Sequence, residues 1–152
     1  MHLGEVLQKR TIYQYYQNWY VLDEDFSWDV EGIYKSTFRH LETHIQVPVV
    51  FCSILQANKI LNDLGEEEDE YLRFASGIYW RELRIIFIFD FEEKVSLMET
   101  IFHEFRHVMQ DRNPHFRHYF ESDKHLPYSE RITEKDAVQF AKQKLNEYLI
   151  AI

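Results

Sequence analysis

One short segment combines residue types that bind metal ions and move protons: His103-Glu104-Phe105-Arg106-His107. On an α-helix, residues four apart lie about 40° round from one another and one turn apart, so His103 and His107 can hold one zinc ion together. Glu104 lies about 100° from His103 on the same side, where its carboxylate can accept a proton from a zinc-bound water without ligating the ion. The motif therefore predicts a catalytic zinc site with Glu104 as the general base.

A helix over about residues 97–111 must position this motif. Ser96 followed three residues later by Glu99 is the capping-box pattern of a helix N-terminus, and Asn113-Pro114 should end the helix. The side of the helix opposite the histidines is apolar, so we expect that side to pack and the histidine side to carry the chemistry. The alternative is a pair of exposed surface histidines without a metal. The apolar positions are Leu97, Met98, Ile101, Phe105, Val108 and Met109.

The third metal ligand should come from a last helix over about residues 129–150. Glu134 falls on its expected apolar stripe, where a carboxylate is costly to bury unless it is paired or bound to a metal. Two histidines, Glu134 and an open position make a catalytic zinc site. Two alternatives stay open: Glu134 is solvated in the first turn, where the helix dipole favours it, or Glu130 is the ligand. The stripe comprises Ala137, Val138, Ala141, Leu145 and Leu149.

Several polar residues near these helices are candidates for supporting roles. Gln110 lies one turn beyond His107 on the histidine face and either holds a ligand in place or is solvated. Asp136 falls on the opposite side of its helix, so we do not expect it to orient a ligand. One of the residues around the start of the last helix could stabilise the oxyanion formed when water attacks a peptide carbonyl. These are Tyr128, His125 and Arg131.

Other histidine pairs lack the same arrangement. His40 and His44 are four apart on a probable helix, but Glu42 lies about 200° from His40 and cannot serve both histidines as Glu104 can. This pair has two possible interpretations: it lies on an exposed polar face, or it belongs to an unrelated second metal site. His115 and His118 are expected to be loop histidines.

Composition narrows the class of protein. The chain has 152 residues, which fit a single domain over 1–152, and 45% of them are apolar. A formal charge of −9 argues against nucleic acid as a partner. The single Cys52 excludes a disulfide framework and should be buried. No secretory signal and no apolar run of about 20 residues is visible, so we expect a cytoplasmic protein with no membrane partner.

The order of elements predicts an α+β domain with a small, about three-stranded sheet packed with helices. Pro48 should place the first strand at an edge or mark its start, and the segment 84–90 reads as a strand buried on both faces. The acidic run 66–70 should be a solvated loop, and 113–128 should be irregular. The expected helices are 5–20, 29–45, 54–64, 97–111 and 129–150, and the expected strands are 46–52, 72–80 and 84–90.

The pairing of His103-Glu104-x-x-His107 with Glu134-x-x-Ala137-x-x-Phe140-Ala141 resembles the zincin metallopeptidases of the gluzincin type. Over about residues 84–145 it is similar to the small ImmA/IrrE-like peptidases of bacteria and phages. The resemblance implies a zincin-like fold, ligation by His103, His107 and Glu134, catalysis by Glu104, and binding of an extended peptide at the sheet edge.

The chain departs from that family at one position beside the motif. Arg106 stands where ImmA-like proteins usually have glycine, and it could bind a substrate carboxylate or a structural acid. No helix-turn-helix module is visible, so a repressor-cleaving role is not implied.

The sequence thus predicts a Zn²⁺-dependent hydrolase, most simply a peptidase acting on a peptide or protein substrate. A second hypothesis is a zincin scaffold of phage or mobile-element origin that binds a partner with little or no turnover. A third is a metal-free structural domain. The sequence leaves the substrate and the oligomeric state open.

Overall fold

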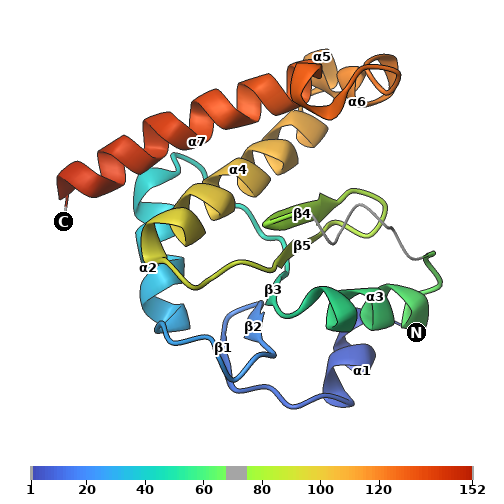
Figure 1. Ribbon diagram of the computed structural model, residues 1–152, viewed down its shortest axis with the longest axis vertical. Helices are drawn as coiled ribbons and strands as arrows, with labels where there is room; N and C mark the ends of the chain where they lie inside the picture. Colours follow the sequence, from blue (N-terminus) through green and yellow to red (C-terminus); the bar gives the residue numbers. More distant parts are fainter. Residues whose placement is uncertain (1, 68–74, 152) are drawn as a thin grey trace.

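The computed structural model describes residues 2–67 and 75–151, and its helices enclose one sheet (Figure 1). The helices are α1 (Leu3–Gln8), α2 (Val30–His40), α3 (Ile54–Asp63), α4 (Lys94–Arg112), α5 (Pro114–Arg117), α6 (Tyr119–Ser122) and α7 (Ile132–Ala151), with a 3-10 turn at Tyr128–Glu130. The strands are β1 (Gln14–Tyr16), β2 (Trp19–Val21), β3 (Val49–Phe51), β4 (Gly77–Trp80) and β5 (Ile85–Ile88).

The sheet is mixed and has the strand order β1-β2-β3-β5-β4. Strands β2, β3 and β5 run parallel, and the two outer strands pair antiparallel to their neighbours. The α+β class is therefore confirmed, but the prediction of about three strands is wrong because the sheet has five. Pro48 marks the start of β3, which is a central strand and not an edge.

The two additional strands come from the segment 5–20, which was predicted to be helical. Helix α1 ends at Gln8, and β1 and β2 form a tight hairpin in which Tyr16 pairs with Trp19. Gln17 turns the chain with a φ of 54°. The tyrosines of this segment are spaced as on a helix, but aromatic residues also favour strands, and pairing of β2 with β3 decides in favour of the sheet.

Side chains alternate between two cores on the two faces of the sheet. Ile86 and Ile88 of β5 belong to one core, and Ile85 and Phe87 belong to the other. Helices α2, α4 and α7 lie on one side of the sheet, and α1 and α3 lie on the other (Figure 1). All four side chains of β5 are buried, as predicted for a strand covered on both faces. The edge strand β4 follows the same alternation, with Tyr79 facing α4 and Ile78 and Trp80 facing away from it.

The motif helix α4 starts earlier than predicted. Its N-cap is Glu93, which makes no side-chain capping bond, and Ser96 lies inside the helix, where its carbonyl accepts a hydrogen bond from Thr100. The predicted capping box is therefore wrong. Leu97 and Met98 are fully buried, and this packing stabilises a first turn that local capping does not mark. Asn113 ends α4 as predicted and caps α5 with its side chain.

The last helix, α7, starts at Ile132. The Asp123 carboxylate, which lies before the helix, accepts a hydrogen bond from the N–H of Ile132. Its buried face is narrower than the predicted stripe, because Val138 and Leu149 are 41% and 39% exposed. Spacings of three and four residues are typical of a seam between two packed helices. This buried seam consists of Glu134, Ala137, Ala141, Lys144 and Tyr148.

The remaining predictions differ in outcome. The helix predicted at 54–64 is confirmed by α3, and the segment 113–128 is wrongly described as irregular, since it contains α5 and α6. Helix α2 ends at His40, so His44 lies beyond it and the pair does not share a helix. In the acidic run predicted to be a solvated loop, Glu66 accepts a hydrogen bond from Trp80, and residues 68–70 lie outside the described residues. Residues 72–74 of the strand predicted at 72–80 also lie outside them. Within the described part, no helix is both long and apolar enough to cross a membrane.

Candidate metal centre

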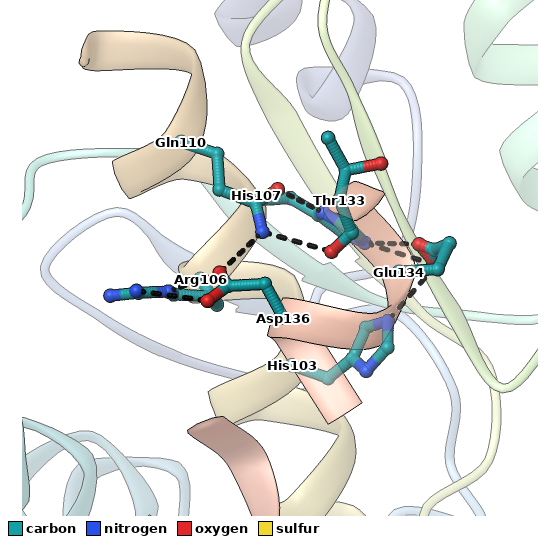
Figure 2. A network of polar contacts seen from close by, with 7 residues as sticks. All are labelled: His103, Arg106, His107, Gln110, Thr133, Glu134 and Asp136. Carbon is teal, nitrogen blue, oxygen red and sulfur yellow. Dashed lines mark hydrogen bonds and ion pairs between the residues drawn. The ribbon is translucent and has the colours of Figure 1, made fainter. Parts of the chain in front are cut away.

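Helices α4 and α7 pack side by side and bring the predicted ligands together (Figure 2). Ala137 and Ala141 are fully buried on the seam of α7, and their small side chains allow the two helices to approach closely. His103 and His107 then point from α4 toward Glu134 in the first turn of α7. The rival ligand Glu130 is exposed on the 3-10 turn before α7, so the structure brings Glu134 and not Glu130 to the histidines.

The distances among these three side chains fit a four-coordinate cation. Nε2 of His103 and Nε2 of His107 each lie 3.2 Å from Oε1 of Glu134, and His107 is also hydrogen-bonded to Oε2 at 2.7 Å. Ligand atoms about 2.0–2.2 Å from a tetrahedral zinc ion are about 3.3 Å apart. In the described part of the chain, these residues form the only group of three or more metal-binding side chains whose ligand atoms converge in this way, within 4.8 Å.

The centre is buried and charged. His107 and Glu134 are only 6% and 5% exposed, which excludes the reading of two surface histidines with a solvated glutamate. Burial alone lowers the pKa of His107, but the hydrogen bond to Glu134 and the charges of Glu104 and Glu134 raise it to about 9. Burial opposes the ionisation of Glu134, and yet hydrogen bonds from both histidines hold its pKa well below its usual range. The site therefore presents an ionised carboxylate in a position where a cation would be stabilised.

Gln110 connects the centre to the scaffold (Figure 2). Its Oε1 accepts a hydrogen bond from Nδ1 of His107 at 2.8 Å, and its Nε2 donates to the carbonyl of Thr133 and to Asp136. Because Nδ1 of His107 donates its proton to Gln110, the other ring nitrogen, Nε2, faces Glu134. This is the orientation that a metal-binding imidazole needs. Of the two alternatives for Gln110, the structure thus supports contact with a ligand and not a solvated side chain.

Asp136 corrects the prediction made from helical geometry. It does not touch either histidine, but it reaches His107 through Gln110 and also forms a bidentate pair with Arg106. Nε of Arg106 lies 2.7 Å from Oδ2 of Asp136, and its guanidinium stacks on the ring of Phe140. Arg106 therefore binds a structural acid, one of the two partners expected for it. This ion pair ties α4 to α7 beside the centre.

Glu104 lies next to the histidines and also next to the edge strand β4. It is 5% exposed, and its carboxylate accepts a hydrogen bond from the backbone N–H of Tyr79. Burial raises the pKa of Glu104, while the nearby His107 and His103 oppose that rise. It lies outside the converging group of ligand atoms, as expected for a base that does not ligate the ion.

The residues before α7 are placed differently from one another. Tyr128 is 62% exposed on the 3-10 turn, but its hydroxyl is turned toward Glu134, where partial burial of that hydroxyl and then the charge of the carboxylate raise the pKa of Tyr128. Arg131 donates to the carbonyls of Leu126 and Lys124 and thus supports the loop. His125 is exposed on that loop. Of these three oxyanion candidates, Tyr128 is the one that the structure brings to the centre.

Comparison with known protein families matches residues 21–151 to the family described as "Protein of unknown function (DUF3920)". The chain belongs to this family. The DUF3920 match includes both site helices and the strands β3, β4 and β5, but only the last residue of β2, so the centre lies within the shared region. No curated protein and no solved structure matches the chain.

Some residues beside the centre of this DUF3920 chain were not predicted from the sequence. Tyr79 reaches Glu104 through its backbone, Thr133 accepts from Gln110, and the ring of Phe120 lies 6.0 Å from that of His107. These contacts join segments far apart in the chain, and no local spacing could have indicated them. The other histidines stay outside: His44 binds Tyr34, and His115 and His118 are exposed at the two ends of α5. Cys52 is fully buried, as predicted.

Proposed function

We propose that this protein is a zinc-dependent hydrolase, and specifically a small metallopeptidase. The observation that carries the proposal is the convergence of His103, His107 and Glu134 at ligand distances, with a buried Glu104 beside them that does not join the ligand set. Two histidines and one glutamate leave a position for water and substrate, as catalytic zinc sites require. A zinc ion held there supplies Lewis acidity that activates water and polarises a carbonyl.

The chain's own residues have distinct roles in this proposal. Glu104 would take a proton from the attacking water and pass it to the leaving amine, because its carboxylate lies beside the ligand group without joining it. Tyr128 donates a hydrogen bond to the oxygen that becomes negative when the carbonyl is attacked. Gln110 and Asp136 hold His107 in the required tautomer.

The edge strand β4 is the proposed binding site for the peptide backbone. Its partner on one side is β5, and its other side has no strand in the described sheet. The carbonyl of Ser76 accepts a hydrogen bond from the Phe89 N–H. Because hydrogen-bonded and non-hydrogen-bonded pairs alternate along an antiparallel ladder, the backbone N–H and C=O groups of Gly77 and Tyr79 point away from β5. The Glu104 carboxylate accepts the Tyr79 N–H at this edge, so a peptide added along β4 would meet Glu104 there.

A zincin-like fold of the gluzincin type is part of the same proposal. Its support is a sheet with a free edge strand, a motif helix lying beside that edge, and a following helix that supplies the glutamate. The alternative, a zincin scaffold that binds a partner without turnover, shares all these features and is separated from the peptidase only by activity.

Metal content is the first test. The purified protein, loaded with zinc and dialysed, should retain about one zinc per chain by mass spectrometry. His103→Ala and Glu134→Ala should lose the metal, whereas Glu104→Gln should keep it. His115→Ala is the matched control, because His115 is exposed outside the centre. Zinc retained after replacement of His103 would overturn the assignment.

Activity is the second test. The zinc-loaded protein should cleave unfolded casein, and Glu104→Gln should lower the rate about 10²- to 10⁴-fold without loss of zinc. Bound zinc with no Glu104-dependent cleavage would favour the binding protein over the peptidase.

A further inference from the structure

Four arginines gather where the edge strand β4 ends, although the chain as a whole carries a charge of −9. Arg81 and Arg84 lie in the turn between β4 and β5, Arg112 ends α4, and Arg117 ends α5. We call them the arginine cluster. Arg81 and Arg117 both approach the carboxylate of Asp111, at 3.2 Å and 3.5 Å.

The arginine cluster adjoins the proposed centre. The guanidinium of Arg81 lies 4.1 Å from the ring of Phe120, and that ring lies 6.0 Å from the imidazole of His107. One aromatic ring thus separates Arg81 from a proposed zinc ligand. Because an extended peptide advances about 3.3 Å per residue, these two contacts place Arg81 at most about three residues of extended peptide away from His107.

The arginine cluster has more guanidinium groups than carboxylates that pair with them. Asp111 pairs with Arg81 and Arg117, and Glu121 lies 3.9 Å from Arg81 but also pairs with Lys124. Among the described residues, no carboxylate lies within 4.0 Å of the guanidinium of Arg84 or Arg112. Arg112 donates to the carbonyl of Gln46 at 3.5 Å, and the charges of Arg84 and Arg112 oppose the rise in the pKa of Tyr79 that burial and Asp111 cause.

The turn between β4 and β5 fixes the place of Arg84. Its φ is 55°, a left-handed conformation that is common at the end of hairpin turns. The turn presents an exposed Arg84 side chain at the end of the proposed peptide-binding edge.

We propose that the arginine cluster is a subsite that binds a carboxylate of the substrate peptide, within about three residues of the scissile bond. This inference rests on the proposed peptidase function and specifies its substrate class. Arginine suits the task because its planar fork matches both oxygens of a carboxylate. The carboxylate is either an acidic side chain or the C-terminus of the peptide, and the two sources share the same chemistry.

Peptide binding to Glu104→Gln tests the proposal without turnover. The probes are three fluorescent nine-residue libraries: one amidated with two adjacent Glu at fixed positions, one amidated with Gln at those positions, and one with Gln and a free C-terminus. Fluorescence anisotropy should give at least about fivefold tighter binding for one of the carboxylate libraries than for the amidated Gln library. The library that binds more tightly identifies the source of the carboxylate.

The decisive variant adds Arg84→Gln and Arg112→Gln to Glu104→Gln. These two changes leave the ion pairs of Asp111 with Arg81 and Arg117 in place, so the fold should be kept. In this variant, the carboxylate library should bind less than about twofold more tightly than the amidated Gln library. The matched control adds Arg39→Gln and Lys59→Gln, two exposed cations on α2 and α3, and should keep the preference.

Two outcomes would overturn the subsite: equal binding of all three libraries, or a preference that survives the double change. Cleavage of the same libraries by the zinc-loaded wild type separates this failure from that of the proposed function. If all libraries are cleaved at equal rates, the peptidase stands and the subsite is wrong. If the protein binds no zinc and cleaves none of them, the proposed function itself fails.

Discussion

Gln110 shows what a single side chain contributes to the centre. Its amide can satisfy His107, Thr133 and Asp136 at once only when its oxygen faces the imidazole. The chain of contacts from Arg106 through Asp136 and Gln110 then fixes the ring of His107 before any metal arrives. At the scale of residues, the centre therefore depends on groups that would not themselves touch the ion.

Gln110→Leu should weaken zinc binding about 10- to 100-fold, because Nδ1 of His107 loses its acceptor and the ring is free to turn. A chelator competition titration measures the dissociation constant. Gln143→Leu, on the exposed side of α7, is the control and should leave the constant unchanged. Wild-type affinity in Gln110→Leu would show that the amide does not position His107.

Tyr128→Phe should keep the bound zinc and lower kcat about 10²-fold or more, because a donor to the developing negative charge is lost. Its hydroxyl already reaches Glu134, so the phenol is within the centre. The comparison of kcat with KM on a peptide substrate is the measurement. A change confined to KM would instead assign Tyr128 to substrate binding.

Among the secondary-structure elements, α4 and β4 are the pair that matters most, because they bring the centre to the sheet edge. Both elements run past each other in the same sense, with Gly77 near Thr100, Tyr79 near Glu104 and Arg81 near Asp111. A Cβ at Gly77 would lie 2.8 Å from Cγ2 of Thr100. Glycine at this position therefore sets how closely the helix approaches the strand.

Gly77→Ala should lower the free energy of unfolding by about 1–3 kcal/mol, since the added methyl overpacks the contact between β4 and α4. Thr100→Ser removes the nearest methyl, so the double variant should recover part of the loss. Urea unfolding of both single variants and the double variant gives the coupling energy. Losses that add within about 0.5 kcal/mol would contradict this contact.

At the scale of the whole molecule, the centre is a small part of a fold with cores on both faces of its sheet. Most of the buried apolar surface lies away from α7, beneath helices α1 to α4. The metal-free protein should therefore stay folded. The proposed cation would mainly strengthen the packing of α7 on α4.

Zinc at about 100 times its dissociation constant should add about 2.7 kcal/mol to the free energy of unfolding, because it binds only the folded chain. Thermal unfolding with zinc and with EDTA measures the shift in Tm. Glu104→Gln should show the same shift, and His103→Ala should show none. Equal Tm values for the wild type in zinc and in EDTA would argue against a cation at the interface of α4 and α7.

The amino-acid sequence by itself predicted the motif helix and the ligand candidates, and it left contact with a ligand as one of two alternatives for Gln110. These features depend on residues three or four apart on one helix, and helical geometry makes such relations local. Glu134 was also predicted, because a carboxylate among apolar positions of a helix needs a partner. The α+β class followed from the order of elements.

Only the tertiary structure decided which distant residues meet. It chose Glu134 over Glu130, turned the segment 5–20 into α1, β1 and β2, and joined Asp136 to Gln110. It also placed β4 at the edge beside Glu104 and gathered the four arginines around its end. Each of these results depends on contacts between segments separated by tens of residues, and the packing energy that selects such contacts is a property of the whole folded chain.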